Sequence, residues 1–189
     1  RPFISVIESL MAFNVWSYNE DHAAAVASIA ASDADIVLLA ELTPDLSHRF
    51  EALASLYPFV SACPAEGPCP ERVLSRWPIR TSAGLVPANN RPGLAWAEIM
   101  LPRGEVITAV AVHVHRPTLG FAQHVTQVRG LIEFLNGIGT RTIVGGDFNV
   151  TPQSTSYASI TEQAGVLGWR WPLPSWPSVG VSLTLLRSL

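Results

Sequence analysis

The sequence predicts one α/β domain in which helices pack outside a core of two β-sheets. Its 189 residues are 48% hydrophobic and 14% charged, a balance that suits one sizeable core but not two. Helix patterns occur in both flanks of the chain, and a run of strand patterns with hairpin signals lies between them. No internal repeat or domain linker interrupts this order in the sequence.

The first flank alternates strand and helix patterns. Residues 9–15 (SLMAFNV) predict a strand, and Asn19 is the expected N-cap of an alanine-rich helix that ends near residue 31. The nearly continuous apolar run IVLLAE, residues 36–41, is typical of a buried strand. A second helix is expected to begin at Pro44, because proline is favoured in the first turn of a helix and apolar residues follow at helical spacing.

The rest of the chain is richer in strand patterns. Strands are expected at residues 73–75, 79–86, 94–101, 105–115 and 142–144, and a turn at 102–104 makes a hairpin of the third and fourth. A helix is expected at residues 121–136, with Gly137 as its C-cap. The C-terminal segment contains Trp169, Trp171 and Trp176, and then VSLTLL, which predicts a final short strand.

The charge of the chain argues against a general affinity for nucleic acid. The formal net charge is −3 and all 12 basic residues are arginine, so a global basic field is absent, although a local arginine cluster could still hold phosphate. No apolar run reaches the roughly 18 residues that a membrane-spanning helix needs. Because the sequence has no initiator methionine, we expect an excised or processed piece whose membrane tether could lie outside it.

The two cysteines bear on the cellular compartment in which the protein works. Cys63 and Cys69 flank a Pro-Ala-Glu-Gly-Pro segment, and they form neither a metal quartet nor a Cys-x-x-Cys motif. A disulfide across this loop is geometrically reasonable, and the alternative is a pair of free thiols in a surface loop. The disulfide would indicate an extracytoplasmic protein.

Polar residues lie at the ends of the predicted apolar strands. They are Asn14, Glu41, His113, His115, Asp147 and Asn149. Buried carboxylates and amides are costly unless they are paired or bind a metal, so the pattern predicts convergence at one rim of a sheet. Carboxylate and amide oxygens suit a hard cation such as Mg²⁺. Each residue also has a purely structural explanation: Asn14 could be a hydrogen-bonded strand residue, and Glu41 could cap the next helix.

Taken in order, these elements resemble the endonuclease/exonuclease/phosphatase family of DNase I-like phosphoesterases. The matching segments are FNVW, IVLLAE, LSRWPI, VHVHRP and GGDFNVTP, which span about residues 9 to 152. The resemblance implies a four-layer α/β sandwich of two mixed sheets with helices outside, and a site at the edge where the sheets meet. The CPAEGPC loop is most similar to that of bacterial members tethered to the outer face of a membrane.

The resemblance also implies roles for individual residues. Glu41 and Asn14 would bind Mg²⁺ or Mn²⁺, with Glu41 the main ligand. Asp147 would orient or deprotonate the attacking water, Asn149 would hold a phosphate oxygen, and His113 would contact the scissile phosphate. Arg116 and His115 are candidate phosphate contacts, although Arg116 could equally be a solvated loop residue. The expected activity is phosphodiester hydrolysis by in-line attack of water, on nucleic acid or on a phospholipid headgroup, both of which stay open.

The sequence departs from the family pattern in two places. Ala40 stands where the family usually has glutamine, and no Asp, Glu or His follows Glu162, where an Asp-His pair is expected. We therefore expect a C-terminally truncated single domain, monomeric but with an exposed sheet edge. Two alternatives stay open: a domain that binds a phosphate ligand without turnover, and an unrelated α/β domain in which the polar residues are structural.

Overall fold

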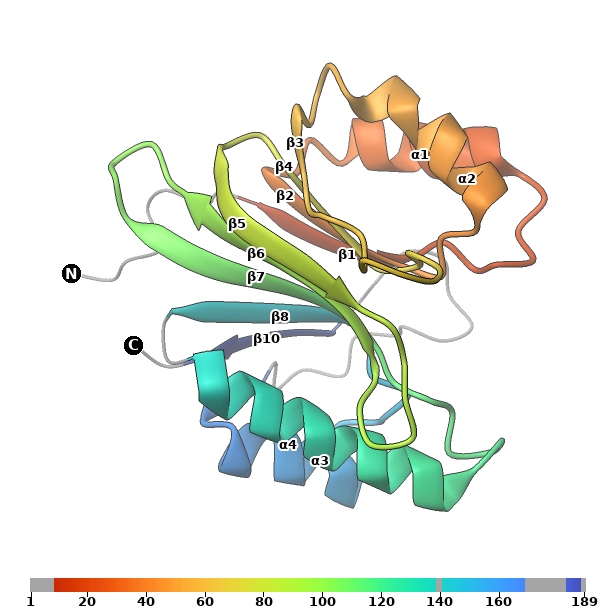
Figure 1. The fold of residues 1–189 in the computed structure, drawn as a ribbon, viewed down its shortest axis with the longest axis vertical. Helices are drawn as coiled ribbons and strands as arrows, with labels where there is room; N and C mark the ends of the chain where they lie inside the picture. The colour runs from red at the N-terminus through yellow and green to blue at the C-terminus, as the bar shows by residue number, and fades with distance from the viewer. Residues whose placement is uncertain (1–8, 139–140, 169–182, 188–189) are drawn as a thin grey trace.

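The computed structural model describes residues 9–138, 141–168 and 183–187, which stack in four layers (Figure 1). Helices α1 (His22–Ala31) and α2 (Pro44–Phe50) cover one sheet, and helices α3 (Phe121–Ile138) and α4 (Thr155–Gln163) cover the other. The two sheets face each other between the helix layers. The predicted four-layer sandwich is therefore confirmed. Among the described residues, no helix has both the length and the apolar character needed to cross a membrane.

The first sheet is built around a fully buried strand. Its strands, in spatial order, are β1 (Leu10–Asn14), β2 (Ile36–Ala40), β4 (Arg72–Ser75) and β3 (Phe59–Val60). Every residue of β2 is buried, as its continuous apolar run predicts. Strands β1 and β2 are parallel, and Asn14 lies opposite Ala40. This register places Asn14 and the residue after Ala40 at the same edge of the sheet.

The second sheet mixes antiparallel and parallel pairs. Its strands, in spatial order, are β5 (Ile79–Leu85), β6 (Gly93–Met100), β7 (Val106–His113), β8 (Thr142–Asp147), β10 (Leu183–Arg187) and β9 (Val166–Leu167). Strands β6 and β7 form the predicted hairpin, and β7 pairs with β8 in parallel, so that His113 lies opposite Asp147. Gly146 has a φ of +141°, and a Cβ at this position would overlap the Val112 carbonyl oxygen of β7. Glycine is therefore required for the close approach of these two strands.

The core has three apolar regions, one beneath each helix layer and one between the sheets. The alternation of β7 shows the division: Val110 and Val112 pack toward α3 and α4, whereas Ala109 and Ala111 face the first sheet. Small side chains are common in the region between the sheets, where Ala12, Ala95, Ala97, Ala109 and Ala111 are all buried. Small residues allow the two sheets to approach closely, which brings their edges together.

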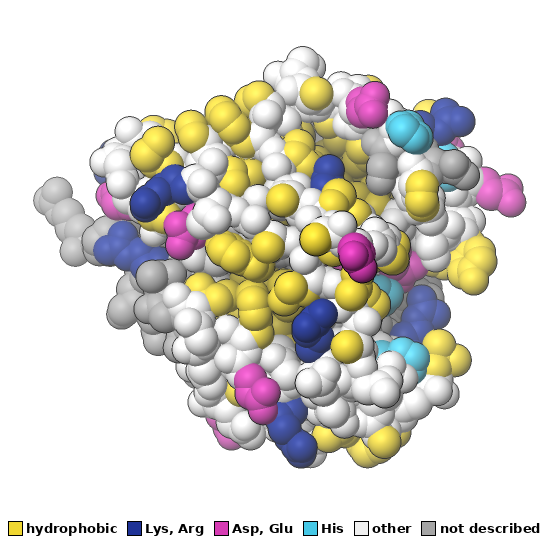
Figure 2. All heavy atoms as spheres, viewed as in Figure 1, with side chains coloured by type: hydrophobic (Ala, Val, Ile, Leu, Met, Phe, Trp, Pro, Cys, Tyr) yellow, Lys and Arg dark blue, Asp and Glu magenta, His cyan; other side chains and the backbone are white. Residues whose placement is uncertain are grey.

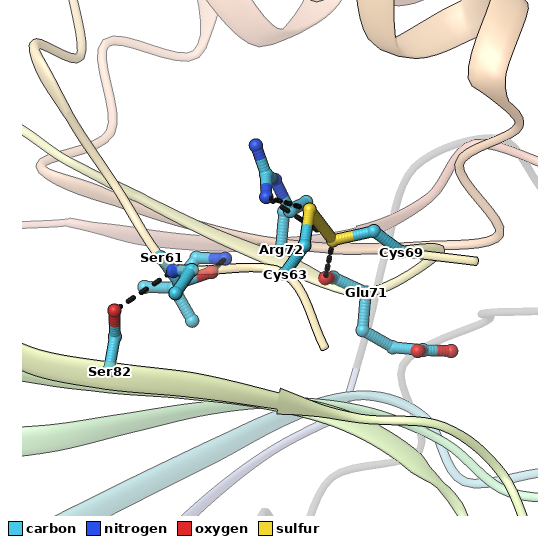
Figure 3. The surroundings of a disulfide bond; sticks show 8 residues. Ser61, Cys63, Cys69, Glu71, Arg72 and Ser82 are labelled. Atoms are coloured by element: carbon cyan, nitrogen blue, oxygen red, sulfur yellow. Dashed lines mark hydrogen bonds between the residues drawn. A yellow bond between two sulfur atoms is a disulfide. The ribbon is translucent and has the colours of Figure 1, made fainter. Parts of the chain in front are cut away.

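The loop before β4 is closed by the predicted disulfide. Cys63 and Cys69 are bonded, with 5.3 Å between their Cα atoms. Figure 3 shows the Arg72 guanidinium beside the bond, where Nη1 donates to the Cys63 sulfur at 2.6 Å and to the Cys69 sulfur at 3.2 Å. The disulfide thus fixes the loop against the first residue of β4.

Two predicted helix ends are wrong. The N-cap of α1 is Asp21, whose Oδ1 accepts the Ala24 N–H at 2.9 Å, whereas the Asn19 side chain caps only the preceding turn by accepting the Asp21 N–H. Both residue types are good caps, and the local pattern could not separate them. Gly137 lies inside α3 rather than after it, because the helix continues to Ile138.

The strand predicted at residues 105–115 ends two residues early, at His113. The short strands β3 and β9 and the helix α4 were not predicted, since α4 has a sparse apolar pattern with Ile160 as its buried residue. The final predicted strand is present as β10. The three C-terminal tryptophans lie outside the described residues.

Candidate active site

Polar side chains from both sheets meet where four parallel-paired strands end. Asn14 ends β1 and Glu41 follows β2, while His113 ends β7 and Asp147 ends β8. The Asn14 amide nitrogen donates to Glu41 Oε1 at 2.8 Å and to Asp147 Oδ2 at 2.9 Å. One amide group therefore links a carboxylate of the first sheet to a carboxylate of the second. The predicted convergence of strand-end residues is confirmed for these four.

Glu41 is the most heavily contacted side chain of the site. Its Oε2 accepts hydrogen bonds from the Ser17 N–H and hydroxyl, each at 3.1 Å, and its Oε1 lies 3.5 Å from His113 Nε2. Burial raises the pKa of Glu41, but hydrogen bonds from Asn14 and Ser17 and the charge of His113 outweigh burial and lower the pKa overall. Glu41 is therefore held as an anion at neutral pH. Sequence reasoning did not identify Ser17 as its partner.

Glu41, His113 and Asp147 form a set of possible metal ligands. One carboxylate oxygen from each acid and one imidazole nitrogen lie within 4.8 Å of one another. Two carboxylates and an imidazole fit a divalent cation such as Mg²⁺ or Mn²⁺, and the imidazole favours the softer Mn²⁺. The Asn14 oxygen accepts the Trp16 N–H at 2.8 Å, so its nitrogen faces the carboxylates. A direct metal bond from Asn14 therefore stays a prediction.

Asn149 is held beside Asp147 by local backbone geometry. Its N–H donates to Asp147 Oδ1 at 2.9 Å, and its side-chain nitrogen donates to the Val114 carbonyl at 2.8 Å. Its φ of +49° is a left-handed conformation. Trp16 and Glu41 also have positive φ, so three of the four described non-glycine residues with this strain lie at the site. Such strain is concentrated at functional sites.

His115 and Arg116 line an open pocket together with Glu41 and His113. Arg116 Nη2 lies 3.9 Å from Glu41 Oε1, and its side chain is 41% exposed, so it can turn toward a ligand. In Figure 2, histidine and basic side chains gather at one end of the junction between the two halves of the molecule, beside hydrophobic ones. Because β7 ends at His113, His113 reaches the pocket from the end of the strand, and His115 reaches it from the loop that follows.

The backbone of His115 is fixed by two buried side chains of α3. The His115 N–H donates to Gln127 Oε1 at 2.8 Å, and its carbonyl lies 2.8 Å from His124 Nδ1. Because a carbonyl can only accept, Nδ1 carries a proton, and His124 Nε2 lies 3.1 Å from the Ser156 hydroxyl. Sequence reasoning missed this support, since Gln127 and His124 look like ordinary positions on a helix face.

Glu71 is a second buried acid near the site that the sequence analysis missed. It is 4% exposed, and its carboxylate lies against Gly93 of β6, where a Cβ would meet both oxygens. Burial raises the pKa of Glu71 to about 8, and the nearby charge of Glu41 adds to the shift. The signal in the sequence was a glutamate directly before Arg72, the first residue of β4.

Comparisons with known proteins agree with this architecture. The model of the endonuclease/exonuclease/phosphatase family matches residues 11–185. A search of curated protein sequences finds no match. Sphingomyelinase C from Streptomyces griseocarneus superposes with a TM-score of 0.73 at 18% identity, covering 95% of this chain and 83% of that one.

Two further solved structures share the fold. D. rerio TDP2 in complex with a single-strand DNA product has a TM-score of 0.72 at 17% identity, covering 95% of this chain and 83% of that one. A Staphylococcus aureus beta toxin variant with bound magnesium ions has a TM-score of 0.68 at 13% identity, covering 93% and 83%. At these identities the likeness establishes the fold, and the family match covers most of the chain.

Proposed function

The chain belongs to the endonuclease/exonuclease/phosphatase family, and on this premise we propose that its pocket hydrolyses phosphodiesters with the help of a divalent metal ion. The observation that carries the proposal is the Asn14 bridge between Glu41 and Asp147, with His113 beside them. Two acids drawn together at strand ends cost free energy unless a cation or a reaction uses them. The family's name describes enzymes that act on phosphate esters.

Glu41, Asp147 and His113 are the residues that would hold Mg²⁺ or Mn²⁺, and for His113 this role differs from the phosphate contact that the resemblance implies. When bound, the ion would neutralise charge on the phosphate oxygens. The beta toxin structure with bound magnesium supports a divalent cation in this fold. The lowered pKa of Glu41 supports its assignment as a ligand, because the carboxylate needs no deprotonation before it binds.

We assign the attacking water to Asp147 and the phosphate oxygens to the surrounding donors. Asp147 Oδ1 accepts the Asn149 N–H, which fixes the carboxylate for orienting or deprotonating a water. The Asn149 side-chain nitrogen carries two hydrogens, and the one that does not bond to Val114 would contact a phosphate oxygen. Arg116 and His115 would bind the same phosphate from the loop after β7.

The test is turnover of bis-(p-nitrophenyl) phosphate with Mg²⁺ or Mn²⁺. We expect Glu41→Ala and Asp147→Ala to lower kcat/KM by about a hundredfold or more, as loss of a catalytic acid or ligand does. Glu133→Ala is the matched control, because Glu133 is an exposed acid of α3. Unchanged turnover in both site variants, with thermal unfolding like that of the wild type, would refute the assignment.

One observation favours a second candidate function. Arg116 and His115 line the open pocket, and donors of this kind can hold a phosphate whether or not it is hydrolysed. A domain that binds a phosphate ligand without hydrolysing it would use the same residues. Binding of phosphate or a phosphodiester that depends on Arg116 and the metal, with no turnover, would support this candidate, whereas any metal-dependent turnover lost in Asp147→Ala would exclude it.

We also propose that the domain works outside the cytoplasm. The Cys63–Cys69 disulfide supports this, since disulfides persist mainly in oxidising compartments. Two alkylatable thiols in protein isolated without reductant would contradict the proposal.

A further inference from the structure

Exposed apolar side chains lie at the pocket and in the segment that leads into α3. Trp16 and Tyr18 follow β1, Leu119 lies in the loop before α3, and Phe121 is the first residue of α3. We call these four residues the apolar rim. Their exposed fractions are 54% for Trp16, 78% for Tyr18, 73% for Leu119 and 67% for Phe121. Trp16, Tyr18 and Leu119 also line the pocket that holds Glu41 and His113, so the rim and the site are continuous.

Among the residues that the structure describes, the side chains of the apolar rim gain little burial from packing within the protein. Trp16 has a φ of +57°, which is unfavourable for a bulky residue, and the Asn14 side chain holds it there by accepting its N–H. Its indole ring nevertheless stays half exposed and meets the Tyr18 ring edge to face, with ring centroids 6.2 Å apart. Clustered exposed apolar residues mark a surface for another molecule, and the strain places that surface at the pocket.

The charge around the apolar rim disfavours a polyanion as that molecule. Exposed Glu20 and Asp21 follow Asn19 in the same loop as Tyr18, and the net charge of the chain is −3. Nucleic acid affinity depends on several lysine or arginine contacts with phosphates, whereas Arg116 is the one arginine lining the described pocket. Leu119 also offers no flat face on which a base could stack. Tryptophan and tyrosine, by contrast, favour the interface between water and lipid.

We propose that the apolar rim docks into the surface of a zwitterionic phospholipid bilayer and so presents the pocket to lipid headgroups. The headgroup step rests on the proposed phosphodiesterase function, while the docking needs no hydrolysis. Side chains on two separate loops can enter the interface together, and the open pocket between them then faces the phosphodiester layer. The absence of a basic field fits a zwitterionic surface rather than an anionic one.

The test is co-sedimentation of the protein with phosphatidylcholine vesicles in EDTA, so that binding is measured without turnover. We expect the wild type to bind, and Tyr18→Ser/Phe121→Ser to bind about tenfold more weakly, because each change removes apolar area from the interface. The matched control is Leu56→Ser/Leu167→Ser, which changes two exposed leucines outside the apolar rim. We expect this control to bind like the wild type. Both pairs alter exposed side chains, and circular dichroism verifies that the variants fold.

Two outcomes would overturn the proposal: the wild type could fail to sediment with the vesicles, or the control pair could lose binding as much as the rim pair. If the vesicles are not bound, a loss of binding to a single-stranded oligothymidylate in the rim pair would assign the apolar rim to nucleic acid instead. Turnover of soluble bis-(p-nitrophenyl) phosphate is measured separately. Turnover without vesicle binding refutes the docking alone, and vesicle binding without turnover refutes the proposed hydrolysis alone.

Discussion

At the scale of single residues, Asn14 joins the two halves of the site. Its nitrogen donates to Glu41 and Asp147, and its oxygen accepts from Trp16. The orientation of the amide follows from these partners, since exchanging its oxygen and nitrogen would set an acceptor against both carboxylates and a donor against the Trp16 N–H. Asn14 thus holds the acids together and also fixes the backbone of Trp16, one residue of the apolar rim.

Glu71 predicts a pH dependence of stability. Its pKa of about 8 in the folded protein lies above the ordinary value of 4.5, so between pH 4.5 and 8 the folded state binds the proton and the unfolded state does not. Stability should therefore fall as pH rises through this window. Glu71→Gln removes the ionisation, and we expect its free energy of unfolding relative to the wild type to rise by a few kcal/mol from about pH 5 to pH 8.

Chemical denaturation of the two proteins at several pH values measures this difference. Glu133→Gln, which changes an exposed acid, is the control and should follow the wild type. Parallel pH profiles for the wild type and Glu71→Gln would show that Glu71 is ionised in the folded protein.

The site residues at strand ends could be predicted from the sequence, whereas Ser17, Gln127 and the exposure of Trp16 could not. Asn14, Glu41 and Asp147 interrupt or end apolar runs, so burial and polarity conflict visibly in the sequence. Ser17 and Gln127 carry no such conflict, because their partners come from segments distant in the chain. The exposure of Trp16 depends on tertiary packing, so it could not be predicted. From the sequence, a tryptophan directly after a strand is expected to be a core residue.

At the scale of elements, α3 positions the pocket as much as the strands do. Gln127 accepts the His115 N–H and donates to the Ala88 carbonyl in the loop between β5 and β6, at 2.8 Å each. The helix can lie so close to that loop because Gly130 has no side chain. The periodicity of α3 could be predicted from the sequence, but its C-terminal end could not. Gly137 resembles a C-cap in the sequence, and only the structure shows that the helix continues to Ile138.

Two glycines of α3 predict opposite effects of the same substitution. A Cβ on Gly130 would overlap the Asn90 carbonyl oxygen, whereas a Cβ on Gly137 would meet nothing within 4 Å. We expect Gly130→Ala to destabilise the protein by about 1–3 kcal/mol through overpacking. Gly137→Ala should stabilise it by about 0.5–1 kcal/mol through helix propensity alone. Thermal and chemical unfolding of both variants measures the contrast, and equal effects would contradict the close docking of α3.

At the scale of the whole molecule, the site depends on the face-to-face packing of two sheets. Each sheet supplies a parallel strand pair, β1 with β2 and β7 with β8, and each pair ends in polar residues at the same edge. The small residues between the sheets bring these edges within hydrogen-bonding distance. The two-sheet core was predictable from alternating helix and strand patterns, whereas the approach of the two edges is a consequence of packing.

Metal affinity tests the central claim most directly. Calorimetric titration with Mn²⁺ should show saturable binding to the wild type and to the surface control Glu133→Gln. Glu41→Gln and Asp147→Asn keep the size of each side chain but remove its charge, and we expect at least about a tenfold loss of affinity in each. Equal affinity in all four proteins, or no binding to the wild type, would contradict a metal site between the two sheets.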